Sequence, residues 1–238
     1  MKAWFIVFEE KAVRGDRVQF LRKQKKAVDV WKLHHRNVPV FVWQSDDNIL
    51  YRMIPIRSFA SLDTLYRKME AISKIINADS LGPDEIPASL STVSGSVMTW
   101  MPELSHQQSS EFSEFAAKPY IEWMFVYLIS GQEQKAEEAL QRFRDYYAQN
   151  NLNYPWDTFR VLMGNNTPLL IGRFRAESPA ALQAKGKKIW EKHGSELEKL
   201  WNNVVQHTWK IENKSGWFNP SLSNLPVAAP GHEVAGGF

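Results

Sequence analysis

The chain of 238 residues contains no cysteine. Disulfides, thiol catalysis and cysteine-ligated zinc or iron–sulfur sites are therefore excluded. No apolar run approaches the ~20 residues that a membrane-spanning helix needs, and residues 1–3 lead directly into a predicted strand without a secretory signal pattern. We therefore expect a soluble, cytoplasmic protein without a membrane partner. A chain whose export signal had been removed would read the same.

The sequence also lacks a large excess of one charge sign and lacks diagnostic motifs. The formal net charge is only +3, which gives no reason to expect a nucleic-acid partner. The sequence contains no phosphate-binding loop, nucleophile elbow, zinc-protease helix or dinucleotide-binding glycine pattern. Basic residues gather on one predicted helix, where we interpret them as a solvated face rather than a site for an anionic partner. They are Arg22, Lys23, Lys25, Lys26, Lys32 and Arg36.

Aromatic residues, in contrast, are abundant. They make up 13% of the chain and include ten Trp. Such large rings are usually buried at least in part, so the composition favours a thick core or a ligand cavity. A chain of this length can bury such a core as one two-lobed unit or as two small domains.

The chain reads as two copies of one pattern. Residues 4–8, Trp-Phe-Ile-Val-Phe, are similar to residues 123–127, Trp-Met-Phe-Val-Tyr, which lie 119 positions later. The predicted turns at residues 45–48 and 163–166 stand 118 positions apart, and both contain Asn, which tolerates a positive φ. Internal similarity of this kind indicates a duplicated structural unit.

Each copy predicts the order strand, helix, strand, strand, helix, strand. This βαββαβ order is that of the ferredoxin-like unit, an antiparallel sheet with two helices on one face. We therefore predict an α+β fold, a tandem duplication of this unit whose two antiparallel sheets pack as an intramolecular dimeric α/β barrel. The longest predicted helix covers residues 179–206, with a break near Gly194. The predicted domains are a first repeat at residues 1–105, a linker at 106–118, a second repeat at 119–215 and a C-terminal arm at 216–238.

This arrangement resembles the dimeric α/β-barrel superfamily over residues 3–213. That superfamily includes NIPSNAP-like proteins, EthD-like proteins, antibiotic-biosynthesis-type monooxygenases and the haem-binding chlorite dismutase group. The resemblance rests on element order and duplication, and no segment selects one family. It implies a cavity between sheet and helices in each half, used for apolar or aromatic small molecules or for haem.

No cofactor is predicted, and haem is the alternative that the resemblance raises. Members with two units in one chain are expected to carry a proximal His on the first helix of the second copy. This chain has no His between His106 and His193, so it departs from the pattern at that position.

Seven side chains are candidate ligand-binding residues, whereas no catalytic residue or metal ligand is identified. His35 stands four residues after Trp31 and continues the apolar face of the first helix toward the sheet. A histidine at a helix C-terminus also interacts favourably with the helix dipole, so a purely structural role stays open. His207 and Trp209 share one face of the last predicted strand. The candidates are His34, His35, Trp4, Trp123, Tyr147, His207 and Trp209.

Charged residues also occur on the predicted strands. Glu9 and Glu10 end the first strand, and only one of them can point inward. Burial would raise the pKa of such a carboxyl group and suit it as a base, and Glu122 offers the same chemistry. An inward arginine would bind a carboxylate. We interpret the carboxylates as solvated and the arginines as exposed at a sheet edge; the arginines are Arg52, Arg173 and Arg175.

Three functions are compatible with the sequence. The first is a protein that binds or transforms a small apolar or aromatic molecule in a barrel cavity. The alternatives are a non-catalytic interaction or oligomeric assembly protein and a haem-binding protein. The expected partners are a small apolar ligand and, for the assembly alternative, further copies of the chain. The sequence does not decide whether the protein is an enzyme.

Overall fold

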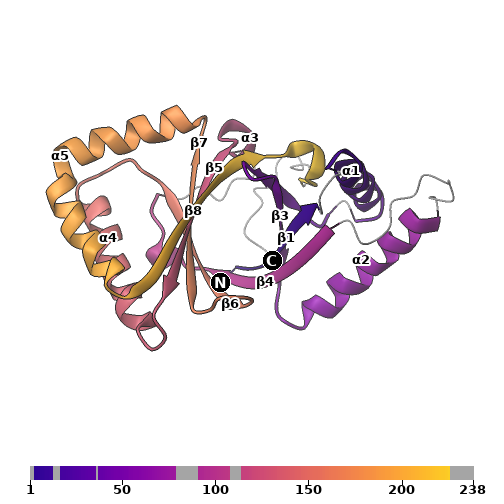
Figure 1. Cartoon of the computed structure of the whole chain (residues 1–238), viewed down its shortest axis with the longest axis horizontal. Helices are drawn as coiled ribbons and strands as arrows, with labels where there is room; N and C mark the ends of the chain where they lie inside the picture. The colour runs from indigo at the N-terminus through magenta and orange to yellow at the C-terminus, as the bar shows by residue number, and fades with distance from the viewer. Residues whose placement is uncertain (1–2, 13–16, 36, 79–90, 108–113, 226–238) are drawn as a thin grey trace. The chain divides into compact units, whose positions relative to one another are not determined.

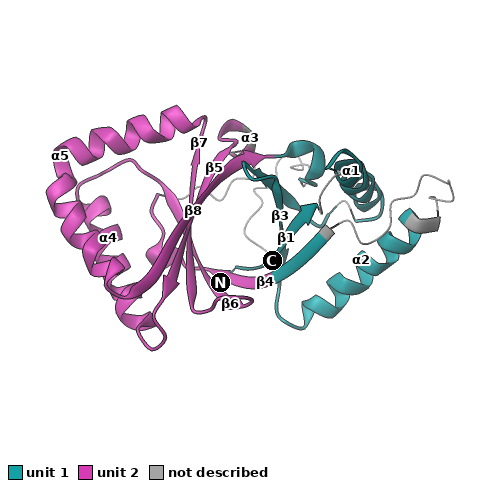
Figure 2. Cartoon of the chain, in the orientation of Figure 1, with its two compact units in different colours: residues 1, 3–95, 219–238 teal, residues 2, 96–218 magenta. Residues whose placement is uncertain are grey.

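The chain forms two compact units, which a computed structural model describes for residues 3–12, 17–35, 37–78, 91–107 and 114–225. Unit 1 is formed by Ala3–Gly95 together with the segment that starts at Asn219, and unit 2 by Ser96–Phe218 (Figure 2). Each unit places helices on one face of an antiparallel sheet (Figure 1), so the chain is α+β, as predicted. The domain boundaries expected from the sequence stay predictions.

Unit 1 contains a sheet with the strand order β1–β3–β2. Its helices α1 and α2 contact each other and cover one face of the sheet (Figure 1). The segment after Phe218 pairs with this unit, where Asn224 bridges to Val40 and the Ser223 hydroxyl accepts a hydrogen bond from the Val42 amide at 2.9 Å. The elements are β1 Trp4–Ala12, α1 Arg17–His34, β2 Phe41–Ser45, β3 Ile49–Ile56, α2 Ser61–Ala78, the start of β4 Ser91–Trp100 and the 3₁₀ helix η3 Pro220–Leu222.

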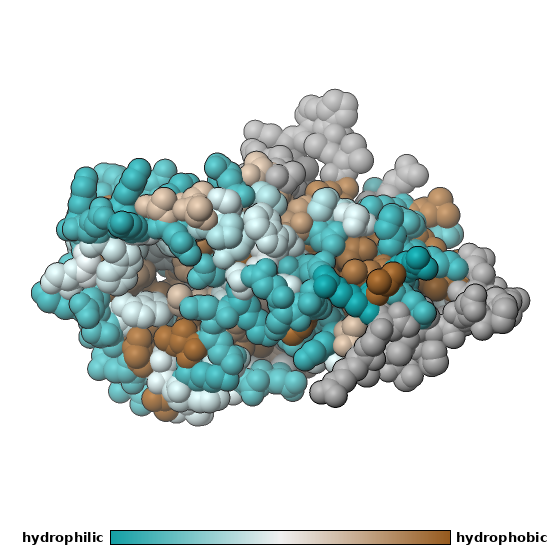
Figure 3. Space-filling model, turned by 45° about the horizontal axis from the view of Figure 1, so that its top comes forward, coloured by the Kyte–Doolittle hydropathy of each residue, from teal (hydrophilic) through white to brown (hydrophobic). Residues whose placement is uncertain are grey.

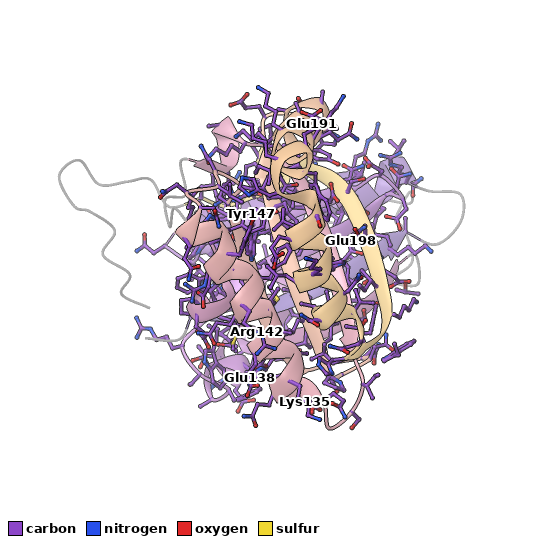
Figure 4. The ribbon with its side chains drawn as sticks, turned by 90° about the vertical axis from the view of Figure 1, so that its left-hand side faces the viewer. Lys135, Glu138, Arg142, Tyr147, Glu191 and Glu198 are labelled. Carbon is purple, nitrogen blue, oxygen red and sulfur yellow. The ribbon has the colours of Figure 1, made fainter. Side chains whose placement is uncertain are left out.

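Unit 2 contains a sheet with the strand order β8–β5–β7–β6–β4. Its helices α4 and α5 lie side by side over one face, with exposed charged residues such as Lys135, Glu138 and Arg142 on α4 (Figure 4). Hydrophilic side chains accordingly dominate this part of the surface, with small apolar patches between them (Figure 3). The elements are the end of β4, η2 Pro102–Leu104, α3 Glu114–Ala117, β5 Tyr120–Leu128, α4 Glu133–Gln149, β6 Trp156–Met163, β7 Leu169–Ala176, α5 Pro179–Val205 and β8 Thr208–Phe218.

Local sequence signals explain several element ends. Asn48 and Asn166 adopt positive φ values of 65° and 63° in the turns after β2 and β6, as predicted. The Ser178 hydroxyl accepts a hydrogen bond from the Ala181 amide at 3.2 Å and caps α5. The expected break near Gly194 is wrong, because α5 is continuous and one helical glycine costs only about 1 kcal/mol.

None of the helices in the described ranges combines the length and apolar character that a membrane crossing requires.

The antiparallel ladders show how the two copies correspond. Phe8 pairs with Arg52 in unit 1, and Val126 pairs with Leu170 in unit 2. Each pair faces the helices of its own unit. The two pairs stand 118 residues apart in the sequence, the same spacing that separates the two turn asparagines. The structural repeat therefore has an offset of 118 residues.

The offset of 119 residues, at which Trp4 matches Trp123, is wrong by one residue. Trp4 shares the helix-facing side of β1 with Phe8 and packs on Phe59, with ring centroids 4.8 Å apart. Trp123 lies on the opposite side of its sheet, 6.3 Å from the Phe159 ring. A slip of one residue exchanges the two faces of a strand, so these two tryptophans do not occupy equivalent positions.

A buried ion pair lies on the face of the unit 2 sheet that is turned away from α4 and α5. Arg173 Nε and Nη2 donate to Asp157 Oδ2 at 2.9 and 2.6 Å, and the two side chains are 8% and 7% exposed. The guanidinium also lies 5.1 Å from the ring centroid of Phe159 and 5.9 Å from that of Trp123. The interpretation of the strand arginines as exposed is therefore wrong for Arg173, and Arg52 is buried as well.

Replacement of Asp157 by alanine should lower the free energy of unfolding by about 3–5 kcal/mol, because it leaves the Arg173 guanidinium buried without its carboxylate. Urea unfolding followed by tryptophan fluorescence measures the change. Asp29→Ala is the matched control, since Asp29 pairs with Lys25 at 3.0 Å in a site where both side chains are 54% exposed. Its effect should stay within about 1 kcal/mol. Equal losses in the two variants would contradict a special role for the buried pair.

Candidate functional site

Unit 2 contains a cavity of about 210 Å³ between its sheet and the helices α4 and α5. Strands β5, β6 and β7 line one side and the two helices line the other. A cavity between sheet and helices is what the sequence resemblance predicts. Aromatic rings dominate its wall: Phe143, Tyr147, Tyr154, Trp156, Phe174, Trp190 and Trp201.

Strand and helix periodicity bring these side chains together. Glu122, Met124 and Val126 alternate along β5, so all three face the helices. Phe143 and Tyr147 stand four residues apart on α4 and face the sheet. Their rings contact each other, with centroids 5.1 Å apart. The cavity wall is therefore a direct consequence of an apolar strand face opposite an aromatic helix stripe.

Two glycines leave space in this wall. Gly172 on β7 corresponds to Ile54 of unit 1 at the offset of 118 residues, so a side chain occupies in unit 1 the place that is open in unit 2. A Cβ on Gly172 would lie 3.4 Å from the Phe174 ring, and a Cβ on Gly186 would lie 3.7 Å from the Tyr154 ring. Both are ordinary contact distances, so the glycines are not required by crowding.

Glu122 is the only carboxylate among the described residues that line the cavity. Its side chain is half-buried and makes no hydrogen bond or ion pair with the other described residues, and burial alone raises the pKa of its carboxyl group. Glu122 is therefore suited to accept a hydrogen bond or a proton from a bound molecule.

Two phenol groups add hydrogen-bond donors to the cavity wall. Burial raises the pKa of Tyr147 to about 12. The pKa of Tyr154 is raised as well, mainly by burial and then by the negative charge of Glu122. Both phenols therefore keep their protons at neutral pH and can donate hydrogen bonds to an oxygen that carries negative charge. One base and two donors inside aromatic walls can hold a small ring compound and stabilise it after it loses a proton.

Of the seven residues predicted from the sequence, Tyr147 lies in the wall of this cavity. Trp123 lies on the other face of β5, and Trp209 is 60% exposed and packs on Tyr127 with ring centroids 5.3 Å apart. Trp4 belongs to unit 1. Ligand-binding roles for these tryptophans stay predictions.

The three predicted histidines lie outside the cavity wall. His34 ends α1 and is exposed. His35 follows it with its ring 5.2 Å from that of Trp31, and desolvation, followed by the charges of Lys68 and His34, lowers the pKa of its imidazole. His207 precedes β8, where its carbonyl oxygen accepts a hydrogen bond from a backbone amide. Their candidate roles also stay predictions.

The cavity contains residues whose position the sequence does not reveal. The interpretation of Glu122 as a solvated carboxylate is wrong, because it faces the helices from the third position of β5. The repeat itself contained a signal in the sequence. At the offset of 118 residues, Glu122 occupies the position of Trp4, which faces the helices of unit 1. Tyr154, in contrast, lies between elements and follows no periodic pattern.

The described lining residues of this cavity do not fit a haem. Haem iron is held in most proteins by His, by a Cys thiolate or by a tyrosinate. No His, Cys, Lys or Arg lines the cavity in the described part of the chain, and both lining phenols hold their protons. The haem propionates would thus find no cationic partner. Across the described ranges, no group of three or more His, Asp or Glu is placed to hold a metal ion.

Comparison with known proteins supports the fold. No family model and no curated protein matches the chain. Among solved structures, an anthrone oxidase-like protein is 12% identical, with coverage of 95% of this chain and 97% of the other and a TM-score of 0.59. A "putative monooxygenase" from Lactobacillus acidophilus NCFM is 9% identical, with coverage of 92% and 94% and a TM-score of 0.54.

A chlorite dismutase variant from Candidatus Nitrospira defluvii is 10% identical, with coverage of 92% of both chains and a TM-score of 0.50. At these identities the similarity concerns the fold alone. The similarity to these structures extends over both units of this chain. The chain therefore shares the fold of these proteins, with the ferredoxin-like unit present twice, as predicted.

Proposed function

We propose that the unit 2 cavity binds a single-ring aromatic compound with an acidic O–H or C–H group, and that Glu122 accepts the proton of this group. The observation that carries the proposal is Glu122 itself, a carboxylate that makes no hydrogen bond or ion pair with another described residue and lies in a mostly aromatic and aliphatic wall. The cavity of about 210 Å³ corresponds to roughly seven water volumes, which suits one ring.

The proposed proton transfer takes place between the ligand and Glu122 and needs no other reactant. The O–H or C–H bond of the ligand breaks, its proton moves to a carboxylate oxygen of Glu122, and the electron pair stays on the ligand. Tyr147 and Tyr154 then donate hydrogen bonds to the anionic oxygen, since both phenols keep their protons. A ring bound between the aromatic walls would displace water from the cavity, which strengthens these interactions.

Replacement of Glu122 by leucine should weaken the binding of phenol by about tenfold or more and leave the binding of toluene within about twofold. Phenol donates a hydrogen bond to the carboxylate, whereas toluene fills the same space without a donor. The methyl NMR signal of Met124, which lines the cavity, reports both titrations. Glu138→Leu on the exposed face of α4 is the matched control and should change the affinity for neither ligand (Figure 4). An unchanged affinity for phenol in Glu122→Leu would contradict the proposal.

Glu122 should also make stability depend on pH. Burial raises its pKa above the ordinary value of 4.5, so the unfolded chain releases this proton at a lower pH than the folded chain. The stabilisation is complete below 4.5 and is lost as the pH rises through the folded-state pKa. Glu122→Gln does not titrate, so its free energy of unfolding should improve relative to wild type across that window. Urea unfolding at a series of pH values measures the difference, and a constant difference would show that burial does not perturb Glu122.

Gly172→Ala should weaken phenol binding while it preserves or raises stability. The added methyl group meets the Phe174 ring at 3.4 Å, so it fits and occupies part of the cavity. Alanine also costs less backbone entropy than glycine inside a strand. Gly95→Ala in unit 1 is the control, since its Cβ would meet only Phe8, at 3.6 Å. Thermal unfolding and phenol titration, measured together, should show weaker binding without a loss of stability only for Gly172→Ala; a parallel loss of both would indicate general disruption.

A further inference from the structure

Unit 1 contains its own cavity, of about 370 Å³, between its sheet and the helices α1 and α2. Apolar side chains form most of its wall, among them Val28 and Trp31 from α1, Ile54 from β3 and Met69 from α2. Another part of the wall carries polar and charged side chains. This combination differs from the unit 2 cavity, whose described lining residues include no cation.

The charged part is organised around Arg52. Its Nε donates to Glu10 Oε1 at 2.8 Å, and its Nη2 donates to Gln24 Oε1 at 2.6 Å. The Arg52 and Glu10 side chains are only 10% and 9% exposed. The remaining nitrogen, Nη1, makes no hydrogen bond with any described residue, although Arg52 lines the cavity. A buried guanidinium with an unused pair of N–H donors at a cavity wall is an anion-binding group.

Lys23 adds a second cation to the same wall. It lies on α1, is half-buried, and forms no ion pair or hydrogen bond within the described ranges. Glu10 neutralises one of the two positive charges, so Arg52 and Lys23 together leave the wall with a net charge of +1. A bound monoanion would balance that charge.

The fold does not require the ion pair. At the offset of 118 residues, Glu10 corresponds to Leu128 and Arg52 corresponds to Leu170. Both leucines are buried in the core of unit 2, at 2% and 1% exposure. Buried ion pairs are often no more stabilising than apolar residues of similar size. The second copy therefore shows that the equivalent ladder forms with leucines, so the charged pair of unit 1 is not a general requirement of the repeat.

We propose that unit 1 binds a small organic carboxylate with an apolar body, whose carboxylate is held by Arg52 Nη1 and Lys23 and whose body packs between α1, α2 and the sheet. The cavity of about 370 Å³ corresponds to roughly twelve water volumes. A medium-chain acid such as octanoate matches this size. The site is independent of the unit 2 cavity and of the reaction proposed there.

A titration with octanoate and octan-1-ol tests this site. The methyl signals of Met69 and Met124, assigned by single Met→Leu substitutions, report the unit 1 and unit 2 cavities separately. Octanoate should shift the Met69 signal, leave the Met124 signal unchanged, and bind at least tenfold more tightly than octan-1-ol. The alcohol is the more apolar ligand, so burial of apolar surface alone predicts the opposite order. Octan-1-ol binding as tightly as octanoate, or octanoate acting at Met124 instead, would overturn the proposal.

Two variants locate the carboxylate. Lys23→Gln should lower the affinity for octanoate several-fold, whereas Lys25→Gln, on the exposed face of the same helix, should leave this affinity unchanged. The double variant Glu10→Leu and Arg52→Leu copies the second unit, should remain folded by circular dichroism, and should lose the preference for octanoate over octan-1-ol. Equal effects of the two lysine variants, or a folded double variant that retains the preference, would overturn the assignment.

Discussion

In each unit, the antiparallel ladder between the first and third strands decides which side chains face the helices. The β1–β3 pairing places Phe8 beside Arg52, and the β5–β7 pairing places Val126 beside Leu170. Because side chains alternate along a strand, one such pair settles the direction of all the others. The contents of both cavities follow from this register. A shift by one residue would turn Glu122 away from the helices and bring Trp123 into its place.

The shared ladder also explains how two similar units acquire different chemistry. At equivalent positions, unit 1 carries Ile54 and Arg52 where unit 2 carries Gly172 and Leu170. The glycine opens space against aromatic rings, and the arginine brings charge to an apolar wall. Neither exchange alters the backbone pairing. The duplicated fold thus tolerates changes on its helix-facing side, and that side lines the cavity of each unit.

Much of the fold follows from local signals in the sequence. The βαββαβ order, the turn asparagines and the Ser178 cap depend on residues close in sequence, and the structure confirms them. The register was missed because β1 and β5 are apolar on both faces, so hydrophobic alternation does not distinguish an offset of 118 residues from one of 119. The burial of Arg173 was missed because Asp157 and its aromatic neighbours come from other strands. Non-local partners of this kind leave no periodic trace.

A crystal structure of the protein grown with phenol tests the central claim most directly, because it shows the register, the cavity and the ligand together. We expect the phenol ring between β5, β7 and the helices α4 and α5, with its oxygen within about 2.5–3.0 Å of a Glu122 carboxylate oxygen. Phenol bound elsewhere, or a cavity filled by the surrounding side chains with Glu122 turned to solvent, would contradict the role assigned to this carboxylate.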